Sequence, residues 1–322
     1  MAKTGTPILD HALDDLRSSR YCLWLGDSHR ILKNCVWVTG EQSYSATLQW
    51  KEDAPSKLEH DEGDAIFGFL GTVSVTALNV GPEGGWQETY GESKIIKQKR
   101  NFRLVVPPAS SDISPHFWKT QFEGATRLVE EGCKPAKSKS YEVTHCFANK
   151  EGGFLRVRSP LFMLGNGAAD NDAEEDTNPG SSSEEGVPQS CKFDTWILSP
   201  NTQEAFERVI EQGYEPQVLE AHDREDKLIH PNNVASTLSG AIVVVYCTLE
   251  RIRFPRNNGR NAEFQFYANL VKVQVVKNAP PSTTTTAGTK RKFLHGYSQS
   301  AQFEADYRAN SAKKMKFTNA TD

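Results

Sequence analysis

The sequence holds two clusters in which basic and aromatic side chains lie close together. The first cluster follows the apolar run 241–249 and precedes a second apolar run, 264–276. Its candidate residues are Arg251, Arg253, Phe254, Arg256 and Arg260. Arginine matches phosphate with a planar fork of donors, and an aromatic ring can stack on an unpaired base. The cluster therefore predicts a site for single-stranded nucleic acid, although a solvated loop with charged ends would have the same composition.

The second cluster precedes another expected strand and contains Trp86, Tyr90, Lys94, Lys97, Lys99, Arg100 and Arg103. Its five basic residues fall within ten positions, which is the local density expected of an electrostatic groove. Lysines on an edge strand also prevent aggregation, so both interpretations stay open. Arg156 and Arg158 flank Val157, and we expect them to share one face of a further strand and to extend the binding surface.

Residue patterns for catalysis or metal binding are missing from the sequence. The eight histidines lie in unlike contexts, and the six cysteines show neither CxxC nor Cys/His ligand spacing. GxGxxG, P-loop and Gly-x-Ser-x-Gly motifs are also missing. We therefore expect a protein that is not an enzyme and has no cofactor and no metal site, with its cysteines reduced inside the cell.

Two strands joined by a short loop are expected to position the first cluster. The run 241–249 is rich in β-branched residues and predicts a buried strand, with 264–276 as its partner. Between them, Pro255 and the segment Asn257-Asn-Gly-Arg260 supply turn residues. The sequence therefore predicts a β-hairpin with a positively charged, aromatic tip.

The first 135 residues predict a β-rich N-terminal lobe. We expect a helix from Pro7 to about Ser18, a second helix that begins at Ser114-Pro115, and strands at 21–25, 34–38, 45–50 and 65–80. Both halves contain an Ala-Ile strand start and a Val-Val pair shortly before Pro-Pro. Duplication of one lobe explains this similarity, and so does chance.

From residue 141 the pattern predicts strands at 141–147, 154–158 and 192–198, a helix at 200–212, and then the hairpin. By this order of elements, residues 141–280 resemble the OB-fold single-stranded nucleic-acid-binding proteins. The resemblance implies a mainly β fold with a few helices (α+β) and an OB-like β-barrel in a domain at 136–280. It also implies that the second and third strands, with their flanking loops, hold single-stranded nucleic acid.

Two polar segments lie outside this pattern. Residues 170–185 hold seven acidic side chains and no basic one, which predicts a disordered acidic insert over 166–189. The insert is either an inert spacer or a screen for the basic surface. Residues 281–322 predict a flexible basic tail, whose candidate nuclear-import residues are Lys290, Arg291, Lys292, Lys313, Lys314 and Lys316. These opposite charges leave the rest of the chain near neutral, so only local patches argue for nucleic acid.

These observations predict a non-catalytic protein that binds single-stranded nucleic acid, preferably DNA, in the nucleus. Protein partners or self-association are expected in addition. No apolar run is long enough to span a bilayer, so a membrane is not an expected partner. The alternative is a β-sandwich structural or interaction protein, such as a viral shell or assembly factor, whose basic tail associates with nucleic acid.

Overall fold

The computed structural model describes residues 7–19, 22–40, 44–52, 54, 63–91, 94–111, 113–134, 141–165, 187–254 and 262–280. The chain divides into a unit at Met1–Pro280 and a unit at Pro281–Asp322. The second unit, with all the nuclear-import candidates, lies outside the described residues. So do residues 166–186 of the expected acidic insert, and Arg256 and Arg260 of the hairpin tip.

The described residues form a mixed α+β fold built on an 11-stranded sheet. The helices are α1 (Pro7–Ser18), α2 (Ser28–Asn34), α3 (Pro115–Cys133), α4 (Pro200–Glu211) and α5 (Pro231–Leu238). The strands of this sheet are β1 (Leu23–Trp24), β2 (Cys35–Thr39), β3 (Ser45–Trp50), β4 (Phe67–Asn79), β5 (Lys99–Val105), β6 (Tyr141–Cys146), β7 (Ala148–Asn149), β8 (Phe154–Pro160), β11 (Ala221–His222), β12 (Ile242–Phe254) and β13 (Ala262–Lys277). β9 (Phe162–Leu164) and β10 (Tyr214–Pro216) pair separately.

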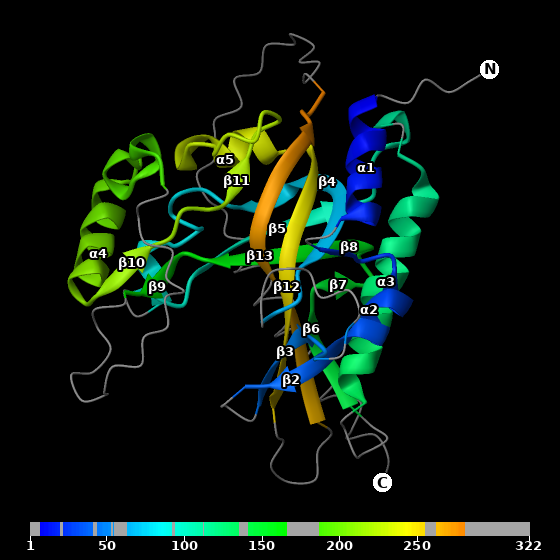
Figure 1. The fold of residues 1–322 in the computed structure, drawn as a ribbon. Coiled ribbons are helices and arrows are strands. Elements are labelled where there is room, and N and C mark those ends of the chain that lie inside the picture. The colour runs from blue at the N-terminus through cyan, green and yellow to red at the C-terminus, as the bar shows by residue number, and fades with distance from the viewer. Residues whose placement is uncertain are drawn as a thin grey trace, which may run out of the picture. The chain divides into compact units, whose positions relative to one another are not determined.

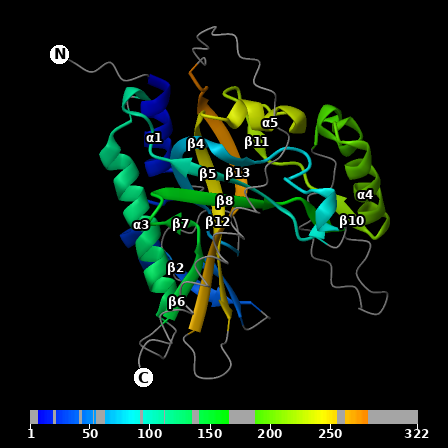
Figure 2. The ribbon, with the colours of Figure 1, turned by 180° about the vertical axis from the view of Figure 1, so that it is seen from behind.

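Five strands of the large sheet form a partial ring. β4 pairs with β5, β5 with β8, β8 with β13, β13 with β12, and β12 pairs back onto β4. Figure 1 and Figure 2 show β5 and β8 crossing the long strands β12 and β13 steeply. The ring takes β4 and β5 from before residue 135 and the other three strands from after residue 141. Among the described residues, the structure does not show the duplication that the sequence left open beside chance similarity.

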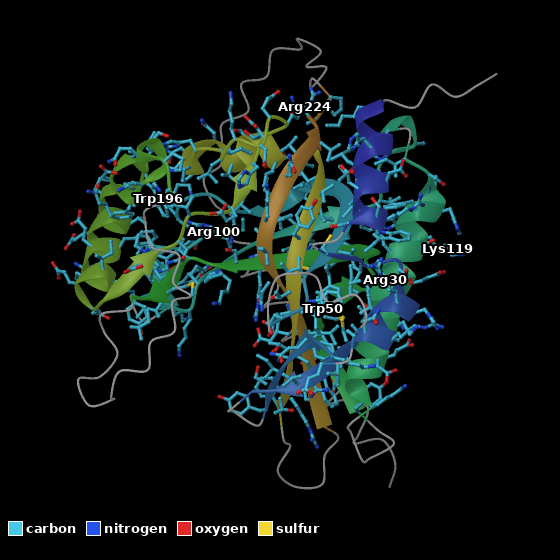
Figure 3. The ribbon with its side chains drawn as sticks, in the orientation of Figure 1. Arg30, Trp50, Arg100, Lys119, Trp196 and Arg224 are labelled. Carbon is cyan, nitrogen blue, oxygen red and sulfur yellow. The ribbon has the colours of Figure 1, made fainter. Side chains whose placement is uncertain are left out.

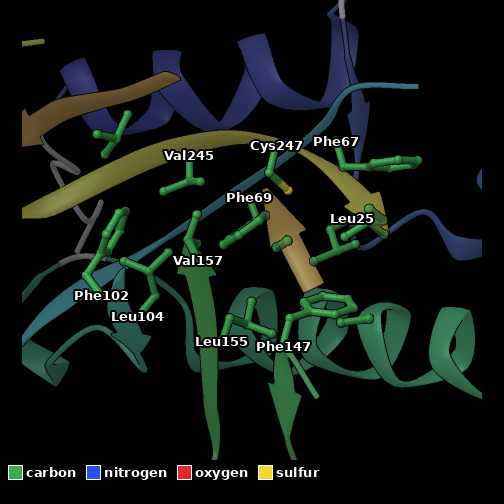
Figure 4. Packing of buried hydrophobic residues seen from close by; sticks show 14 of the residues in the cluster. Leu25, Phe67, Phe69, Phe102, Leu104, Phe147, Leu155, Val157, Val245 and Cys247 are labelled. Carbon is green, nitrogen blue, oxygen red and sulfur yellow. The ribbon is translucent and has the colours of Figure 1, made fainter. Parts of the chain in front are cut away.

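The interior of the partial ring is apolar. Buried side chains such as Phe69 of β4, Phe102 of β5, Val157 of β8 and Val245 of β12 point into one shared core (Figure 4). Successive side chains of a strand alternate between its two faces. The residues between these core positions therefore lie on the outside of the ring.

Helix α3 packs closely against the start of the sheet. The buried amide of Gln121 accepts a hydrogen bond from Leu70 N at 3.1 Å, and it also donates to Leu70 O. Gly124 approaches Leu25 so closely that a Cβ atom there would lie 2.0 Å from the Leu25 carbonyl oxygen. This packing satisfies backbone groups of β4 that no neighbouring strand satisfies, and it leaves no room for a side chain at position 124.

The structure confirms the predicted helices α1, α3 and α4, the strand β3 and the β12–β13 pair. The predicted strand at 192–198 is wrong, because Gln189–Cys191 and Phe193–Thr195 form two 3₁₀ turns. The indole of Trp196 donates to the carbonyl of Cys191 at 3.0 Å, which holds the chain in this turned conformation. The element order that suggested an OB-fold thus lacks its third strand within 141–280.

Candidate nucleic-acid interface

The outside of the partial ring carries polar, charged and aromatic side chains along neighbouring strands. Its outward residues are Lys99, Asn101 and Arg103 on β5, Phe154, Arg156 and Arg158 on β8, Gln265, Tyr267 and Asn269 on β13, and Thr248 and Glu250 on β12. We call this set the polar face. Strand alternation places it opposite the apolar core, so its composition is not set by packing.

Two arginines of the polar face lie directly opposite each other. The register of β5 and β8 pairs Arg103 with Arg156. Burial lowers the pKa of Arg156, and the nearby charge of Arg103 lowers it further. Among the described residues neither guanidinium has a carboxylate partner, and Arg156 Nε lacks any hydrogen bond. Like charges at directly opposite positions destabilise a sheet, so a bound anion would stabilise this arrangement.

The half-buried ring of Phe154 lies beside both of these arginines. The Cζ atom of Arg103 is 4.4 Å from the ring centroid, and the Cζ atom of Arg156 is 5.6 Å from it. Both distances fall in the range of cation–π contacts. The face thus combines an aromatic ring with two guanidinium groups that lack an anionic partner.

Arg158 has a different environment, because it is held by an acid and an amide. Its Nη2 donates to Glu250 Oε2 at 2.7 Å, and its Nε donates to Asn269 Oδ1 at 2.8 Å. Asn269 Nδ2 donates in turn to the same Glu250 oxygen at 3.0 Å. The guanidinium Cζ lies 3.3 Å from the ring centroid of Tyr267. These contacts fix both the position and the plane of the Arg158 fork.

His145 of β6 adjoins this network without adding charge to it. Its ring centroid is 4.8 Å from that of Tyr267. Burial lowers the pKa of His145 to about 4, and the charges of Arg156 and Arg158 act in the same direction. The imidazole is therefore neutral near pH 7.

The polar face unites residues from two separate parts of the sequence prediction. Lys99 and Arg103 come from the second cluster, while Arg156 and Arg158 were expected to extend the first. Burial lowers the pKa of Lys99; the nearby charge of Arg158 acts in the same direction, and that of Glu250 acts against it. The structure thus joins the second cluster to the arginines of β8.

Two of the predicted arginines are buried. Arg100 is 1% exposed; its guanidinium donates to the carbonyl of Gln217 and lies 5.2 Å from the Trp196 ring centroid, on the side of α4 (Figure 3). Arg251 is 7% exposed and donates to the carbonyl of Gly132 at 2.9 Å. Strand alternation turns both residues away from the polar face, so neither belongs to the candidate interface.

The rest of the second cluster lies in the segment before β5. Trp86 is buried, with its indole donating to the carbonyl of Gly91 at 3.3 Å. Lys94 lies 5.5 Å from the ring centroid of Tyr90, and Lys97 is exposed. The structure therefore does not bring these side chains together with the arginines of β8.

The described part of the hairpin tip consists of Arg253 and Phe254, at the end of β12. Both are exposed, Phe254 by 40%. Phe254 is four residues from Glu250, so alternation places it on the side of the polar face. Arg253, one residue earlier, belongs to the opposite side.

Sequence reasoning missed the aromatic and hydrogen-bonding members of the polar face: Phe154, Tyr267, Asn269, Glu250 and His145. The signal that finds most of them is strand alternation. Phe154 precedes Arg156 by two residues, and Tyr267 precedes Asn269 by two. The pairing of β8 with β13, which brings these two sets together, rests on Asn269 opposite Arg158 and has no local signal.

The described residues hold neither a metal-ligand cluster nor a membrane-spanning helix. In this part of the chain, no group of three His, Cys, Asp or Glu side chains is placed to hold a metal ion. None of its helices combines the length and apolar character needed to cross a bilayer.

Neither a family model nor a curated protein matches this sequence. Among solved structures, the single-stranded DNA-binding protein gp2.5 encoded by bacteriophage T7 matches at 12% identity and a TM-score of 0.32, over 70% of this chain and 98% of that chain. The single-stranded DNA-binding protein of bacteriophage Enc34 matches at 13% identity and a TM-score of 0.26, over 80% and 98%. A C-terminal truncation of the Enc34 protein matches with a TM-score of 0.27. Each of these matched structures is a single-stranded DNA-binding protein of a bacteriophage.

Proposed function

We propose that this protein binds single-stranded DNA through the polar face and catalyses no reaction. The observation that carries the proposal is the cross-strand pair of Arg103 and Arg156, with Phe154 beside it. Two opposed cations without an acidic partner among the described residues are unfavourable alone and favourable around an anion. A nucleic-acid backbone supplies such anions at regular spacing.

The aromatic side chain favours a single strand over a duplex. A base can stack on Phe154 only when it is not already stacked between neighbours in a double helix. The Cζ atoms of Arg103 and Arg156 lie 4.4 and 5.6 Å from the centroid of the same ring, so a base stacked on the ring can have its flanking phosphates at the arginines. Single-strand binders combine cations and aromatic rings in this way.

The proposal also includes the architecture of the partial ring. We take the partial ring of β4, β5, β8, β13 and β12 as an OB-like barrel, and the polar face as its binding surface. The hairpin tip, with Phe254, Arg256 and Arg260, would extend this surface, whereas Arg253 lies on the opposite side of β12. Action in the nucleus, through the basic tracts at 290–292 and 313–316, is supported by the sequence alone.

The proposal is tested by fluorescence anisotropy with a labelled single-stranded oligonucleotide, a matched duplex and a matched RNA. The test variant carries Arg103→Gln and Arg156→Gln. We expect weaker binding to the single strand and a flatter dependence of log Kd on log salt, by about 0.7 unit for each lost phosphate contact. The duplex should bind more weakly than the single strand to the unmodified protein.

The matched control is Arg224→Gln, an exposed arginine between β11 and α5 (Figure 3). It removes one positive charge away from the polar face, so affinity and salt dependence should stay close to those of the unmodified protein. Equal affinity and equal salt dependence in the double variant and the unmodified protein, with both folded, would overturn the proposal. Large assemblies by size exclusion without any binding of the oligonucleotide would favour the structural alternative.

A further inference from the structure

The cations of the polar face fall into two kinds. Within the described residues, Arg103, Arg156 and Lys99 have no carboxylate within ion-pair distance. Arg158 forms an ion pair with Glu250, and each of these two side chains is 20% exposed. A cation without a partner carries a net charge at the surface, whereas an ion pair does not.

The pair of Arg158 and Glu250 is fixed by its surroundings. Glu250 Oε2 accepts from both Arg158 and Asn269, and its Oε1 accepts from Ser45 Oγ at 3.3 Å. Tyr267 lies against the guanidinium plane. This network uses two of the five N–H donors of Arg158 and leaves both charged groups at the surface. A fixed donor next to a fixed acceptor is suited to hydrogen bonding with a planar polar group.

We infer that the Arg158–Glu250 pair contacts an unpaired base, whereas Arg103, Arg156 and Lys99 contact phosphates. The inference rests on the proposed function and assigns separate roles within the same face. A phosphate on the free donors of Arg158 would lie beside the Glu250 carboxylate and be repelled by it, and a phosphate in place of that carboxylate would cost the hydrogen bonds that Glu250 accepts from Arg158 and Asn269. The unpaired cations offer the same phosphate a site without this cost.

A base, in contrast, can bind the pair as it stands. The Watson–Crick edge of each base presents hydrogen-bond donors and acceptors side by side, and proteins read this edge in single strands. In a duplex the same edge is occupied by the complementary base. The pair therefore adds a second reason, besides stacking on Phe154, for the face to select a single strand.

The salt dependence of binding separates the two roles, because only phosphate contacts release counterions. We expect Arg156→Gln to reduce the slope of log Kd against log salt by about 0.7 unit. Arg158→Gln should weaken binding roughly tenfold, because its contacts to the base are lost. The slope is measured in the double variant Arg158→Gln with Glu250→Gln, which removes both charges of the pair and should therefore leave the slope unchanged. Glu250→Gln should steepen the slope by about 0.7 unit, because it leaves the charge of Arg158 without a partner.

The conservative variant Arg158→Lys separates the loss of the planar fork from the loss of the positive charge. Lysine keeps the charge and binds phosphate, but it cannot reproduce the planar fork that reaches Glu250 and Asn269. We expect Arg158→Lys to lose affinity as Arg158→Gln does. Near-normal affinity of Arg158→Lys, or a slope reduced by the double variant as much as by Arg156→Gln, would overturn the inference and leave the proposed function standing. Unchanged binding in all the arginine variants would instead remove the proposed function itself.

Discussion

Arg100 and Arg103 lie on the same strand, three residues apart, and have opposite environments. Arg100 is buried against Trp196 and donates to a backbone carbonyl, whereas Arg103 lies on the polar face opposite Arg156. Three residues along a strand is an odd number, so the two side chains point to opposite faces. Arg100 holds the segment around Gln217 and Trp196 against the sheet, and Arg103 is placed to contact a ligand.

The same contrast recurs on β12, where Arg251 and Glu250 are neighbours. Arg251 is buried and bonds the carbonyl of Gly132 at the end of α3, while Glu250 lies on the polar face and pairs with Arg158. Charge alone therefore does not identify a binding residue in this protein. The position of a charged residue in the strand alternation, and the presence or absence of an acidic partner, separate the two kinds.

The largest expected effect is on stability and comes from Arg100→Ala. The substitution removes a buried side chain from contact with Trp196 and leaves the Gln217 carbonyl without this donor, which should cost about 2–4 kcal/mol of the free energy of unfolding. Arg103→Ala should change that free energy by less than about 0.5 kcal/mol, because it also removes a like-charge contact. Urea denaturation followed by circular dichroism measures both. A larger loss in Arg103→Ala than in Arg100→Ala would reverse the assignment of the two residues.

The next effect is on binding and concerns Phe154. Phe154→Leu keeps an apolar side chain and removes the ring, so stacking on a base is lost while the fold is kept. We expect a loss of about 1–3 kcal/mol in the free energy of binding to a single-stranded oligonucleotide. The slope against salt should not change, because no phosphate contact is removed. Affinity equal to that of the unmodified protein would show that no base stacks on this ring.

A smaller effect concerns pH and His145. The pKa of His145 is about 4 in the folded protein, because of burial and the nearby Arg156 and Arg158, and about 6.5 in an unfolded chain. Between these values the unfolded chain binds a proton that the folded chain does not. The free energy of unfolding should therefore be highest above pH 6.5 and should fall as the pH is lowered toward 4.

His145→Gln removes this contribution, so its free energy of unfolding should fall less than that of the unmodified protein between pH 7 and pH 4.5. The control is His116→Gln, at an exposed position in the first turn of α3, which should follow the unmodified protein. Denaturant titrations at the two pH values measure the difference. Parallel losses in the unmodified protein and His145→Gln would contradict a buried, neutral imidazole.

Local patterns predicted much of the secondary structure and little of the sheet. The β-branched run at 241–249 and the proline-initiated helices gave β12, α3 and α4, because these signals lie within one element. The partial ring depends on β12 pairing with β4, some 170 residues away in sequence, and on the single paired position between β8 and β13. Such pairings depend on packing across the whole core and have no local signal.

Only part of the candidate site was predicted, because some of its members have a local signal and others do not. Arg156 and Arg158 were found because they flank Val157, and alternation is a local property. Lys99 and Arg103 were found by charge density, which also selected the buried Arg100. The aromatic and acidic members required the register between strands, since Glu250 and Tyr267 become neighbours of Arg158 only in the folded sheet.

The smallest expected effect concerns the hairpin tip and tests how far the interface extends along β12. Phe254 is 40% exposed and shares the side of the polar face with Glu250, but four residues of extended strand separate the two. At about 3.3 Å per residue this is roughly 13 Å, the span of a few nucleotides. A nucleic-acid strand bound at Phe154 and Arg156 reaches Phe254 only if it is long enough. The hairpin tip should therefore affect the binding of long oligonucleotides alone. We expect Phe254→Ala, or Arg256→Ala with Arg260→Ala, to leave the affinity for an oligonucleotide of about 4 nucleotides unchanged and to weaken binding of one of about 16 nucleotides. Anisotropy titrations of both lengths at one salt concentration measure this, with Phe154→Leu as the variant that should weaken both. Equal losses for the short and the long oligonucleotide in the tip variants would place the tip inside the central site, and no loss for either would confine the interface to the polar face.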